Sequence, residues 1–491
     1  MKIAFASSEV YPFAKTGGLG DVIGALPKAL QEMGCHVKVF VPKYAIIDHS
    51  KFVLTYDWSI GEMPIRVAGR VHNVNVYMST LPESNVEVYF IDCPFFFNRS
   101  NIYTGDHDED ERFILYSKAV IESLQRLQWQ PDIIHCNDWQ TGLIPFYIKE
   151  NYNWDYKFLG NTATVMSIHN VAYQGRFPKE TVVKAEIRPE LFYPNSPIEV
   201  WGAVCFLKIG LMYADVINTV SKTYAEEITT SDKGMGLQDI LRYRINDFYG
   251  ILNGVDYSVW NPQSDKYIPS HFSAENLTGK AQVKEYLLNR LHLPIKPGVP
   301  LIGIISRLVD QKGFDLVADS INELMQFNAQ WIILGSGDER LENLFRGLSY
   351  AFPDSVSTYI GFNNELSHVI EAGADMFLMP SQFEPCGLNQ IYSLKYGTVP
   401  IVRKTGGLAD TVLDWHEMAH LGKDTGTGIS FMDYNTHALV SSVGRALELF
   451  QNKEIWSQII QNGMKQDFSW SVSAKEYIEL YKKAIYNRRV L

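Results

Sequence analysis

Two nearly identical glycine-rich segments are the first residues in this sequence that could do chemistry. The segment KTGGLGD occupies residues 15–21, and KTGGLAD recurs at residues 404–410. Each follows an apolar run, residues 2–6 or 399–402, and each opens a helical pattern. Such a turn between a strand and a helix can present backbone N–H groups and a lysine to an anion. The repeated segment therefore suggests a two-lobed enzyme that closes on a phosphorylated substrate.

Other polar residues follow predicted strands, at the edge where open parallel sheets bind their ligands. Arg307 and Lys312 follow one such strand and can neutralise a diphosphate, the arginine with two parallel hydrogen bonds. Glu384 precedes a helix expected to start near Leu388. Its carboxylate can either cap that helix or hold a sugar hydroxyl.

In the first half of the chain, His169 and the segment Asn137-Asp138-Trp139 also follow predicted strands. His169 is either a general base or a buried residue that makes hydrogen bonds. Asp138 and Trp139 together resemble a carboxylate and an aromatic platform for a sugar ring, although a tryptophan can equally belong to the core.

Several motifs of other enzyme classes are incomplete or absent. Residues 335–337 read GSG, but Arg340 occupies the third glycine position of the dinucleotide fingerprint, which excludes a nicotinamide oxidoreductase. The sequence contains no Walker A lysine and no GxSxG. An HExxH occurs at residues 416–420, but no third zinc ligand follows it, so we interpret it as the end of a surface helix.

Alternating strands and helices must position these residues. Predicted strands of the first half lie at residues 36–41, 52–56, 71–78, 86–91, 132–135, 164–168 and 216–220. Those of the second half lie at 301–306, 331–334, 357–360, 376–379 and 399–402, each followed by a helical stretch. The pattern predicts a parallel sheet covered on both faces in each half.

Helix ends and a boundary can also be proposed from the sequence. Asp21 is a candidate N-cap for a helix that ends at Gly34. Turn-forming residues between 253 and 262 place the main boundary near residue 257. A last helix at residues 474–486 could cap either lobe, and we interpret the acidic run at residues 106–111 as a solvated loop or helix start.

The overall composition limits the class of protein. A chain of 491 residues suggests about two to three domains. The net charge of -11 argues against a nucleic-acid-binding surface. Five cysteines without any CxxC pair suit a reducing compartment. Strand-like sequence from Lys2 leaves no room for a leader, and no apolar run approaches the ~20 residues of a membrane helix, so we expect a cytoplasmic protein.

The motifs at residues 15–22, 169–175, 307–313 and 384–408 occur in the order in which one family carries them, and they span almost the whole chain. In these motifs the sequence resembles bacterial glycogen synthases and plant starch synthases. These are retaining glycosyltransferases of the GT-B architecture, an α/β fold in which two doubly wound Rossmann-like domains face across a deep cleft. The resemblance implies an acceptor-side domain at residues 1–257, onto which the C-terminal helix at 472–491 crosses back, and a nucleotide-sugar-binding domain at residues 258–471.

The family's activity is transfer of glucose from ADP-glucose, with UDP-glucose as the alternative donor, to the non-reducing 4-hydroxyl of an α-1,4-glucan or malto-oligosaccharide, with retained configuration. The resemblance implies no cofactor, no metal, and no nucleic-acid or membrane partner, and a location in the bacterial cytoplasm or the plastid stroma. Residues implied as catalytic are Glu384, Lys312, Arg307, His169 and Asp138. Residues implied to bind substrate are Lys15, Gly17, Gly18, Asp21, Asn253, Gly387, Leu388, Asn389, Thr405 and Gly406.

In these roles, Arg307 and Lys312 would neutralise the diphosphate, and Lys15 with its glycines would reach the donor from the other lobe. Glu384 would orient the glucose. His169 would contact the sugar, and Asp138 would lie beside the acceptor.

One position departs from the wider GT-B pattern. Tyr392 stands where many relatives carry a second glutamate, which glycogen and starch synthases commonly lack. Ribose binding is therefore unassigned, and Tyr392 can be a core residue. Two alternatives remain open from the sequence: a GT-B transferase with a small acceptor, and a catalytically silent glucan-binding protein on the same scaffold.

Overall fold

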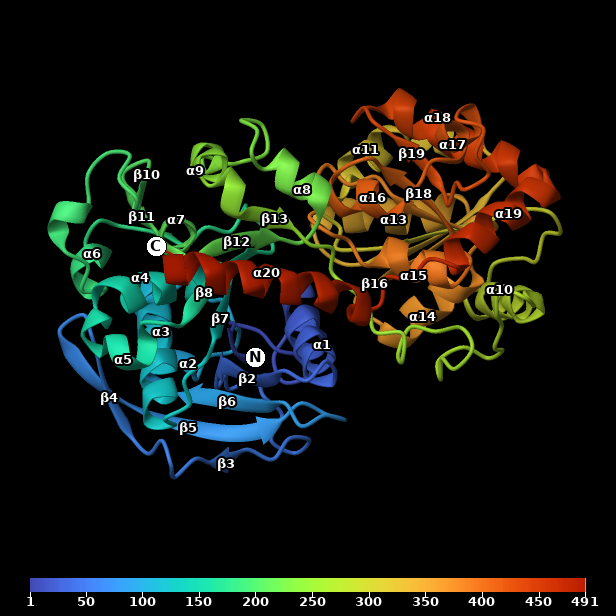
Figure 1. Cartoon of the computed structure of the whole chain (residues 1–491). Helices are drawn as coiled ribbons and strands as arrows, with labels where there is room; N and C mark the ends of the chain where they lie inside the picture. Colours follow the sequence, from blue (N-terminus) through green and yellow to red (C-terminus); the bar gives the residue numbers. More distant parts are fainter. Residues whose placement is uncertain (491) are drawn as a thin grey trace. The chain divides into compact units, whose positions relative to one another are not determined.

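The computed structural model describes residues 1–490, and the chain divides into two compact units. Unit 1 comprises Met1–Gly254 together with the C-terminal residues from Trp470 onward, and unit 2 comprises Val255–Ser469. Each unit is built around its own sheet (Figure 1). Within residues 1–490, no helix combines the length and the apolarity that crossing a bilayer requires.

Unit 1 is centred on a ten-stranded sheet with the order β13-β12-β8-β7-β1-β2-β6-β5-β3, with β4 paired to β5. The strands from β13 to β6 run parallel, and β1 lies between β2 and β7 in the buried middle. The strands are β1 (Lys2–Ala6), β2 (His36–Pro42), β3 (Thr55–Tyr56), β4 (Met63–Val67), β5 (Arg70–Thr80), β6 (Glu87–Asp92), β7 (Ile133–Asn137), β8 (Ala163–Ile168), β12 (Val216–Thr219) and β13 (Phe248–Gly250). A separate antiparallel sheet contains β9 (Arg176–Phe177), β10 (Glu199–Val200) and β11 (Ala203–Cys205).

The edge of this sheet corrects the prediction of an entirely parallel arrangement. Strands β3, β4 and β5 pair antiparallel, and β5 is antiparallel to β6. Ala68 and Gly69, both with positive φ, form the turn that joins β4 to β5. So short a connection closes a hairpin, whereas parallel neighbours need a crossover of a dozen or more residues.

Helices cover unit 1, and they include the last helix of the chain. They are α1 (Gly18–Glu32), α2 (Pro94–Phe97), α3 (Glu109–Arg126), α4 (Leu143–Glu150), α5 (Tyr156–Leu159), α6 (Thr181–Lys184), α7 (Phe206–Tyr213), α8 (Lys222–Glu227), α9 (Gln238–Tyr243) and α20 (Trp470–Val490), with short 3-10 turns η1 (Trp139–Thr141), η2 (Asn153–Asp155), η3 (Pro189–Leu191) and η4 (Ile245–Asp247). Helix α20 packs against α1, β8 and β12 (Figure 1). Buried Tyr481 joins it to the sheet through a 2.8 Å hydrogen bond between its hydroxyl and Nδ1 of His135.

Unit 2 is a doubly wound α/β domain with a six-stranded, fully parallel sheet of order β16-β15-β14-β17-β18-β19. Its strands are β14 (Leu301–Ile305), β15 (Gln330–Gly335), β16 (Val356–Ile360), β17 (Met376–Met379), β18 (Val399–Arg403) and β19 (Ile429–Phe431). Its helices are α10 (Thr278–Arg290), α11 (Phe314–Asp319), α12 (Ile321–Leu324), α13 (Glu339–Ala351), α14 (Asn364–Gly373), α15 (Asn389–Lys395), α16 (Gly406–Thr411), α17 (Trp415–His420), α18 (Thr436–Gln451) and α19 (Lys453–Met464), with the 3-10 turn η5 (Asp310–Lys312).

A stack of rings fixes the segment that enters unit 2. Trp260 lies face to face with His368 on one side and Tyr392 on the other, with ring centroids 3.6 and 3.9 Å away. His368 also pairs with buried Asp265 at 2.7 Å. Tyr392 is half-buried and stacks on Trp260, which accounts for an aromatic residue at this position.

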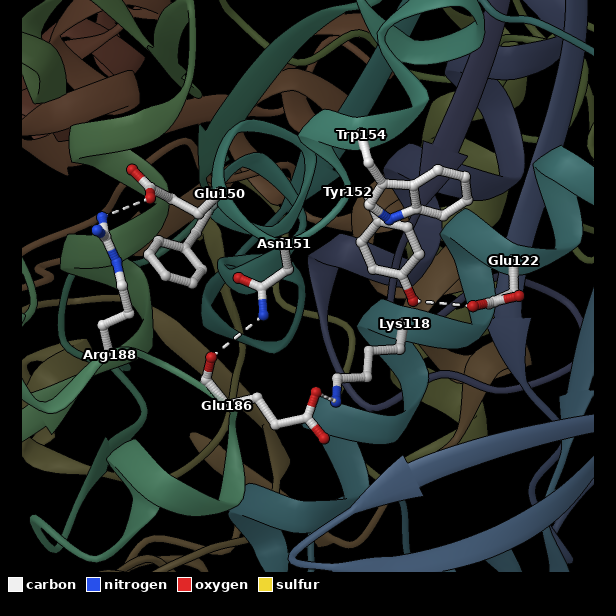
Figure 2. A pocket seen from close by; sticks show the side chains of 9 residues that line it. Lys118, Glu122, Glu150, Asn151, Tyr152, Trp154, Glu186 and Arg188 are labelled. Carbon is white, nitrogen blue, oxygen red and sulfur yellow. Dashed lines mark hydrogen bonds and ion pairs between the residues drawn. The ribbon is translucent and has the colours of Figure 1, made fainter.

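A pocket of about 420 Å³ opens on unit 1 among α3, α4, η2 and the segment that follows α6 (Figure 2). Its lining residues are Lys118, Glu122, Phe146, Glu150, Asn151, Tyr152, Trp154, Glu186 and Arg188.

Candidate active site

A buried carboxylate and a lysine meet at the carboxyl edge of the unit 2 sheet. Glu384 follows β17 and Lys312 lies in η5 after β14, and these two strands are neighbours in the sheet. Lys312 Nζ lies 2.6 Å from Oε2 of Glu384, which also accepts a 3.1 Å hydrogen bond from Ser381 Oγ. Parallel topology thus brings together two charged residues that are far apart in sequence.

Arg307 lies at the same edge, two residues after the end of β14, and its side chain is exposed. Within residues 1–490, its guanidinium makes no hydrogen bond or ion pair with a side chain, so it can bind an anion without losing a partner. Asn389, by contrast, donates a 2.9 Å hydrogen bond to the carbonyl of Ile305 and so fixes the end of β14. Gly387 (φ 71°) and Leu388, the N-cap of α15, form the turn in front of that helix.

The second glycine-rich loop lies directly against Glu384. Gly407 donates a 3.1 Å hydrogen bond to the carbonyl of Glu384. Gly406 has φ 45°, and a Cβ on it would lie 1.9 Å from that same carbonyl oxygen. Buried Thr405 precedes this contact as the N-cap of α16. The loop therefore supports the backbone of Glu384, and only glycine fits at Gly406.

In unit 1, Asp138 and His169 occupy the carboxyl ends of the neighbouring strands β7 and β8. Oδ1 of Asp138 accepts a 2.8 Å hydrogen bond from the backbone N–H of His169. Burial raises the pKa of Asp138 to about 7, and the charge of Glu9 adds to this effect. Asp138 also has a φ of 56°, which is uncommon for a residue other than glycine. Strain and a costly buried carboxylate at one position are typical of functional sites.

The histidine of this pair is neutral and its tautomer is defined. Burial lowers the pKa of His169 to about 4. Its Nε2 lies 2.9 Å from Oδ1 of Asn137, whose amide nitrogen donates to the carbonyls of Ala6 and His135. Because that amide orientation leaves only an acceptor toward His169, Nε2 carries the proton and Nδ1 can accept a hydrogen bond.

The first glycine-rich loop differs from the expected phosphate cradle. Lys15 Nζ lies 2.6 Å from Oδ1 of Asp21. The backbone N–H groups of Thr16 and Gly17 donate to Oε2 of buried Glu9 at 2.7 and 3.0 Å, so these donors are already used. Helix α1 begins at Gly18 with Gly17 as its N-cap, so the prediction of Asp21 as N-cap is wrong, and Asp21 instead lies in the first turn.

Space remains around this loop for a ligand. A Cβ on Gly17 or Gly18 would have no atom within 4 Å. Asn253, which follows β13, is buried, and its Oδ1 has no hydrogen-bond partner within residues 1–490. Gly17 and Gly18 therefore leave room for contacts with a substrate, whereas the amide oxygen of Asn253 is covered by protein.

Glu9 and Tyr103 are site residues that sequence reasoning missed. Tyr103 donates a 2.7 Å hydrogen bond to Oε1 of Glu9, and Thr16 Oγ1 donates to the same oxygen at 2.7 Å. Glu9 follows β1, so the rule of polar residues after strands could have identified it. Tyr103 lies in the loop between α2 and α3, where the sequence carries no such signal.

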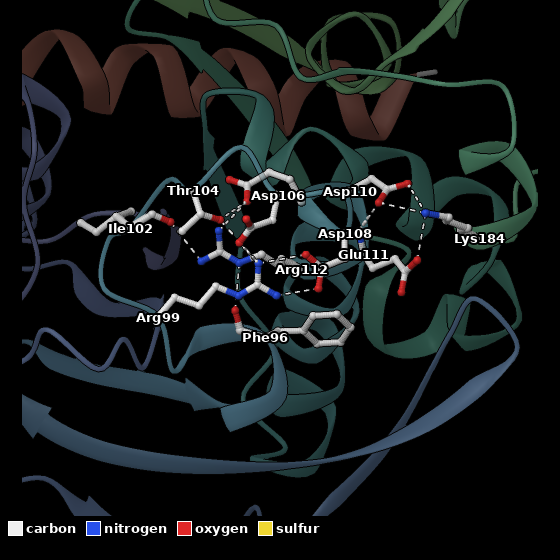
Figure 3. Close-up of polar contacts among 11 residues, drawn as sticks. Phe96, Arg99, Ile102, Thr104, Asp106, Asp108, Asp110, Glu111, Arg112 and Lys184 are labelled. Atoms are coloured by element: carbon white, nitrogen blue, oxygen red, sulfur yellow. Dashed lines mark hydrogen bonds and ion pairs between the residues drawn. The ribbon is translucent and has the colours of Figure 1, made fainter.

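The acidic run holds the loop that carries Tyr103 (Figure 3). Arg99 pairs with Asp108 at 2.5 Å, and fully buried Arg112 pairs with Glu109 at 2.6 Å while donating to the carbonyl of Ile102. The predicted helix start is confirmed, because α3 begins at Glu109. The prediction of a solvated run is wrong for residues 108–110, which are buried because nearby cations neutralise them.

The structure also shows what surrounds Trp139 and the HExxH segment. Trp139 is 8% exposed and packs against Phe113 and Phe177, so the core interpretation holds and the sugar-platform interpretation does not. In the HExxH segment on α17, Glu417 pairs with Lys404 and the ring of His420 bonds to the carbonyl of His416. Within residues 1–490, no group of three metal-ligating side chains is found.

Known protein families and individual proteins match this sequence over most of its length. Two family models match the chain: "Starch synthase catalytic domain" over residues 2–243 and "Glycosyl transferases group 1" over residues 289–466. The glycogen synthase of Thermosipho melanesiensis is 44% identical over 489 residues, covering 99% of this chain and 100% of that protein. The glycogen synthase of Thermotoga maritima is 43% identical and covers 99% of each chain.

A solved structure has the same fold. The catalytic domain of starch synthase IV from Arabidopsis thaliana, bound to ADP and acarbose, matches with a TM-score of 0.90 at 32% identity, covering 99% of both chains. The two Rossmann-like units, with the glycosyltransferase family model and the starch synthase structure that they match, identify a glycosyltransferase of the GT-B class, which confirms the expected fold class. Within that class, the chain belongs to the glycogen and starch synthase family.

Proposed function

We propose that this protein is a retaining α-1,4-glucan synthase, which transfers glucose from ADP-glucose to the non-reducing 4-hydroxyl of an α-1,4-glucan. The observation that carries the proposal is the contact between Lys312 and buried Glu384 beside exposed Arg307. The similar starch synthase IV was solved with ADP and acarbose bound, which supports an ADP-sugar donor and a glucan acceptor for this chain. Unit 2 binds the nucleotide sugar, and unit 1 with α20 binds the acceptor.

In the reaction, the bond between the anomeric carbon of glucose and the β-phosphate oxygen breaks, and a bond to the acceptor O4 forms on the same face. The acceptor hydroxyl gives its proton to the departing phosphate oxygen, and ADP leaves. Arg307 and Lys312 balance the charge that develops on the diphosphate, where fixed cations are most useful in the transition state. No protein base is needed for this proton transfer.

Glu384 orients the glucose and stabilises the positive charge on its ring. Lys312 holds the carboxylate of Glu384 until the diphosphate arrives. Gly387, Leu388 and Asn389 form the wall of the donor site, and Thr405 and Gly406 keep Glu384 in place.

In unit 1, neutral His169 accepts a hydrogen bond from a sugar hydroxyl through Nδ1, and Asp138 binds the acceptor sugar. Lys15, held by Asp21, contributes a cation, and Gly17 and Gly18 leave room for the substrate. Asn253, whose buried amide oxygen has no hydrogen-bond partner within residues 1–490, completes the substrate-binding residues of this unit.

We place the protein in a reducing compartment such as the cytoplasm. All five cysteines are buried as free thiols, and burial raises the pKa of Cys136, Cys205, Cys93 and Cys35, so the thiol form is favoured.

The proposal is tested by incubating the protein with ADP-glucose or UDP-glucose and maltoheptaose. Nucleotide release and product chain length are measured together. We expect ADP to be released from ADP-glucose while the primer lengthens stepwise. We expect UDP to be released more slowly from UDP-glucose. Nucleotide release without primer extension would indicate a different acceptor, and the absence of both activities would overturn the proposal.

A further inference from the structure

The pocket on unit 1 carries chemistry that the active site does not use (Figure 2). Trp154, in η2, is 69% exposed and lines the pocket, and its ring centroid lies 6.3 Å from that of Tyr152. Gln125 on α3 donates a 2.5 Å hydrogen bond to the carboxylate of Asp155, which fixes η2 in place. An exposed tryptophan held at the rim of a pocket is a surface on which the apolar face of a ring can stack.

The charged residues of the pocket are paired with one another. Arg188 pairs with Glu150 at 2.8 Å, Lys118 pairs with Glu186 at 2.9 Å, and the Tyr152 hydroxyl donates to Glu122 at 3.0 Å. Each carboxylate uses one oxygen in these contacts, which leaves the second oxygen as an acceptor. Three carboxylates stand against two cations, which disfavours an anionic ligand.

These features favour a neutral ligand with many hydroxyl groups. Carboxylate oxygens accept hydrogen bonds from hydroxyls, while Arg188 and the side-chain amide of Asn151 can donate to them. The ring of Trp154 supplies a flat apolar surface beside this polar rim. An aromatic platform with carboxylate, amide and guanidinium groups fits the face and the edge of a sugar ring.

The pocket lies away from the catalytic edge of unit 1. Asp138 and His169 follow the carboxyl ends of β7 and β8, whereas η2 lies between α4 and the start of β8. Helix α4 begins shortly after Asp138, and its residues Phe146 and Glu150 line the pocket. The pocket therefore belongs to the amino-terminal edge of the same sheet, opposite the edge where such sheets bind substrates.

We propose that this pocket is a second α-glucan-binding site, in which Trp154 stacks on a glucose unit and the surrounding polar side chains bind its hydroxyls. The inference rests on the proposed function, because a polymer substrate is what gives such a site a use. A site distant from the catalytic edge holds the glucan near the enzyme between transfers, which raises the effective concentration of chain ends.

β-Cyclodextrin is the probe, because this cyclic α-1,4-glucan has no non-reducing end and cannot serve as an acceptor. Its binding is measured by calorimetry for the wild type, Trp154→Ala and the control Trp58→Ala, which removes another exposed tryptophan of unit 1. We expect Trp154→Ala to weaken binding about tenfold, the loss of one ring stack, and Trp58→Ala to bind as the wild type does. Circular dichroism confirms that both variants are folded.

Turnover provides the second measurement. For Trp154→Ala we expect a several-fold higher KM for glycogen, with unchanged kcat and unchanged KM for maltotriose. Equal binding of β-cyclodextrin by the wild type and Trp154→Ala would overturn the proposal. The proposal would also be overturned if the wild type bound cellohexaose, a β-1,4-glucan, as tightly as it binds β-cyclodextrin. If the protein binds β-cyclodextrin through Trp154 but transfers no glucose, the proposed function fails while the second site stands.

Discussion

At the residue scale, the candidate site depends on charged groups that are held in place before any substrate arrives. Lys312 and Glu384 form a short contact with 19% and 6% of their side chains exposed. Removing either partner of such a pair leaves the other charge poorly compensated, so part of any effect is structural. A control with an exposed pair of the same residue types separates the two contributions.

Lys312→Ala and Glu384→Ala are each expected to lower kcat by more than tenfold, which corresponds to about 1.4 kcal/mol of barrier. Lys404→Ala is the control, because Lys404 pairs with the half-exposed carboxylate of Glu417. Turnover is measured with saturating ADP-glucose and maltoheptaose, and melting temperatures show whether each variant is folded. Near-normal turnover of either variant would remove that residue from the catalytic machinery.

Glu9 is expected to position the Lys15 loop. Its carboxylate accepts four hydrogen bonds, from Thr16 N, Thr16 Oγ1, Gly17 N and the Tyr103 hydroxyl. Glu9→Gln replaces one acceptor oxygen with a donor, so we expect kcat to fall about tenfold. In a double-mutant cycle, Glu9→Gln should cost little once Lys15→Ala is present. Independent, additive losses would contradict the positioning role, and Glu87→Gln on β6 is the control.

The raised pKa of Asp138 predicts a pH-dependent stability. Between pH 4 and 7 the folded protein keeps a proton on Asp138, whose pKa is about 7, while the unfolded chain, with the ordinary value of 3.8, releases it. Stability therefore falls as pH rises through this window, at up to about 1.4 kcal/mol per pH unit. The Asp138→Asn variant has no such titrating group and does not lose this stability. The melting temperature of the variant minus that of the wild type should therefore rise between pH 4 and 7 and then level off.

The opposite effect of His169 does not obscure this test. Its pKa, lowered to about 4 from 6.5, makes stability fall as pH decreases from 6.5 toward 4, but both proteins contain this histidine. The effect therefore cancels in the difference. A melting-temperature difference that stays constant from pH 4 to 8 would show that Asp138 is ionised normally.

At the element scale, the two similar glycine-rich segments have different surroundings. In unit 1 the loop is held by Glu9, and Lys15 remains 39% exposed. In unit 2 the loop is packed under Glu384, and Lys404 pairs with Glu417 on α17. The same residues thus leave a partly exposed lysine in one unit and support the backbone of Glu384 in the other.

Gly406→Ala is expected to displace Glu384. Its new Cβ would lie 1.9 Å from the carbonyl oxygen of Glu384, so the loop must move. We expect a loss of about 2 kcal/mol in the free energy of unfolding and a more than tenfold lower kcat. Gly444→Ala, on α18 where a Cβ would meet its nearest atom at 3.7 Å, is the matched control. A fully active Gly406→Ala would contradict the supporting role.

At the scale of the whole molecule, the chain passes between its two units twice, at Gly254 and Val255 and again at Ser469 and Trp470. Both passages are fixed at their ends. Within unit 2, Val255 bridges to Ser469, and within unit 1 Gly254 packs against the backbone of Trp470. Two short neighbouring connections are typical of a hinge.

Donor binding is therefore expected to change the overall dimensions of the protein. In small-angle X-ray scattering, ADP should reduce the radius of gyration, because lobes that close exclude water from the reacting bond. Lys312→Ala with the same ADP concentration is the control, since weaker diphosphate binding should weaken the effect. Identical scattering profiles with and without ADP would argue against closure.

The sequence by itself determined the fold class, the family and most of the strands. Short apolar runs such as residues 301–306 and 376–379 correspond to β14 and β17, because a strand buried on both faces has to be apolar throughout. The sequence also predicted that Arg307 and Glu384 lie just after strands. These inferences succeeded because they depend on neighbours in sequence.

Only the tertiary structure decided which of these residues meet. Lys312 and Glu384 contact each other because β14 and β17 are neighbours in the sheet, and strand order is not written in any local pattern. The buried state of Asp108, the core position of Trp139 and the role of Glu9 likewise depend on partners distant in sequence. A side chain's charge and its capacity for hydrogen bonds are local properties, but its burial and its partners are set by packing.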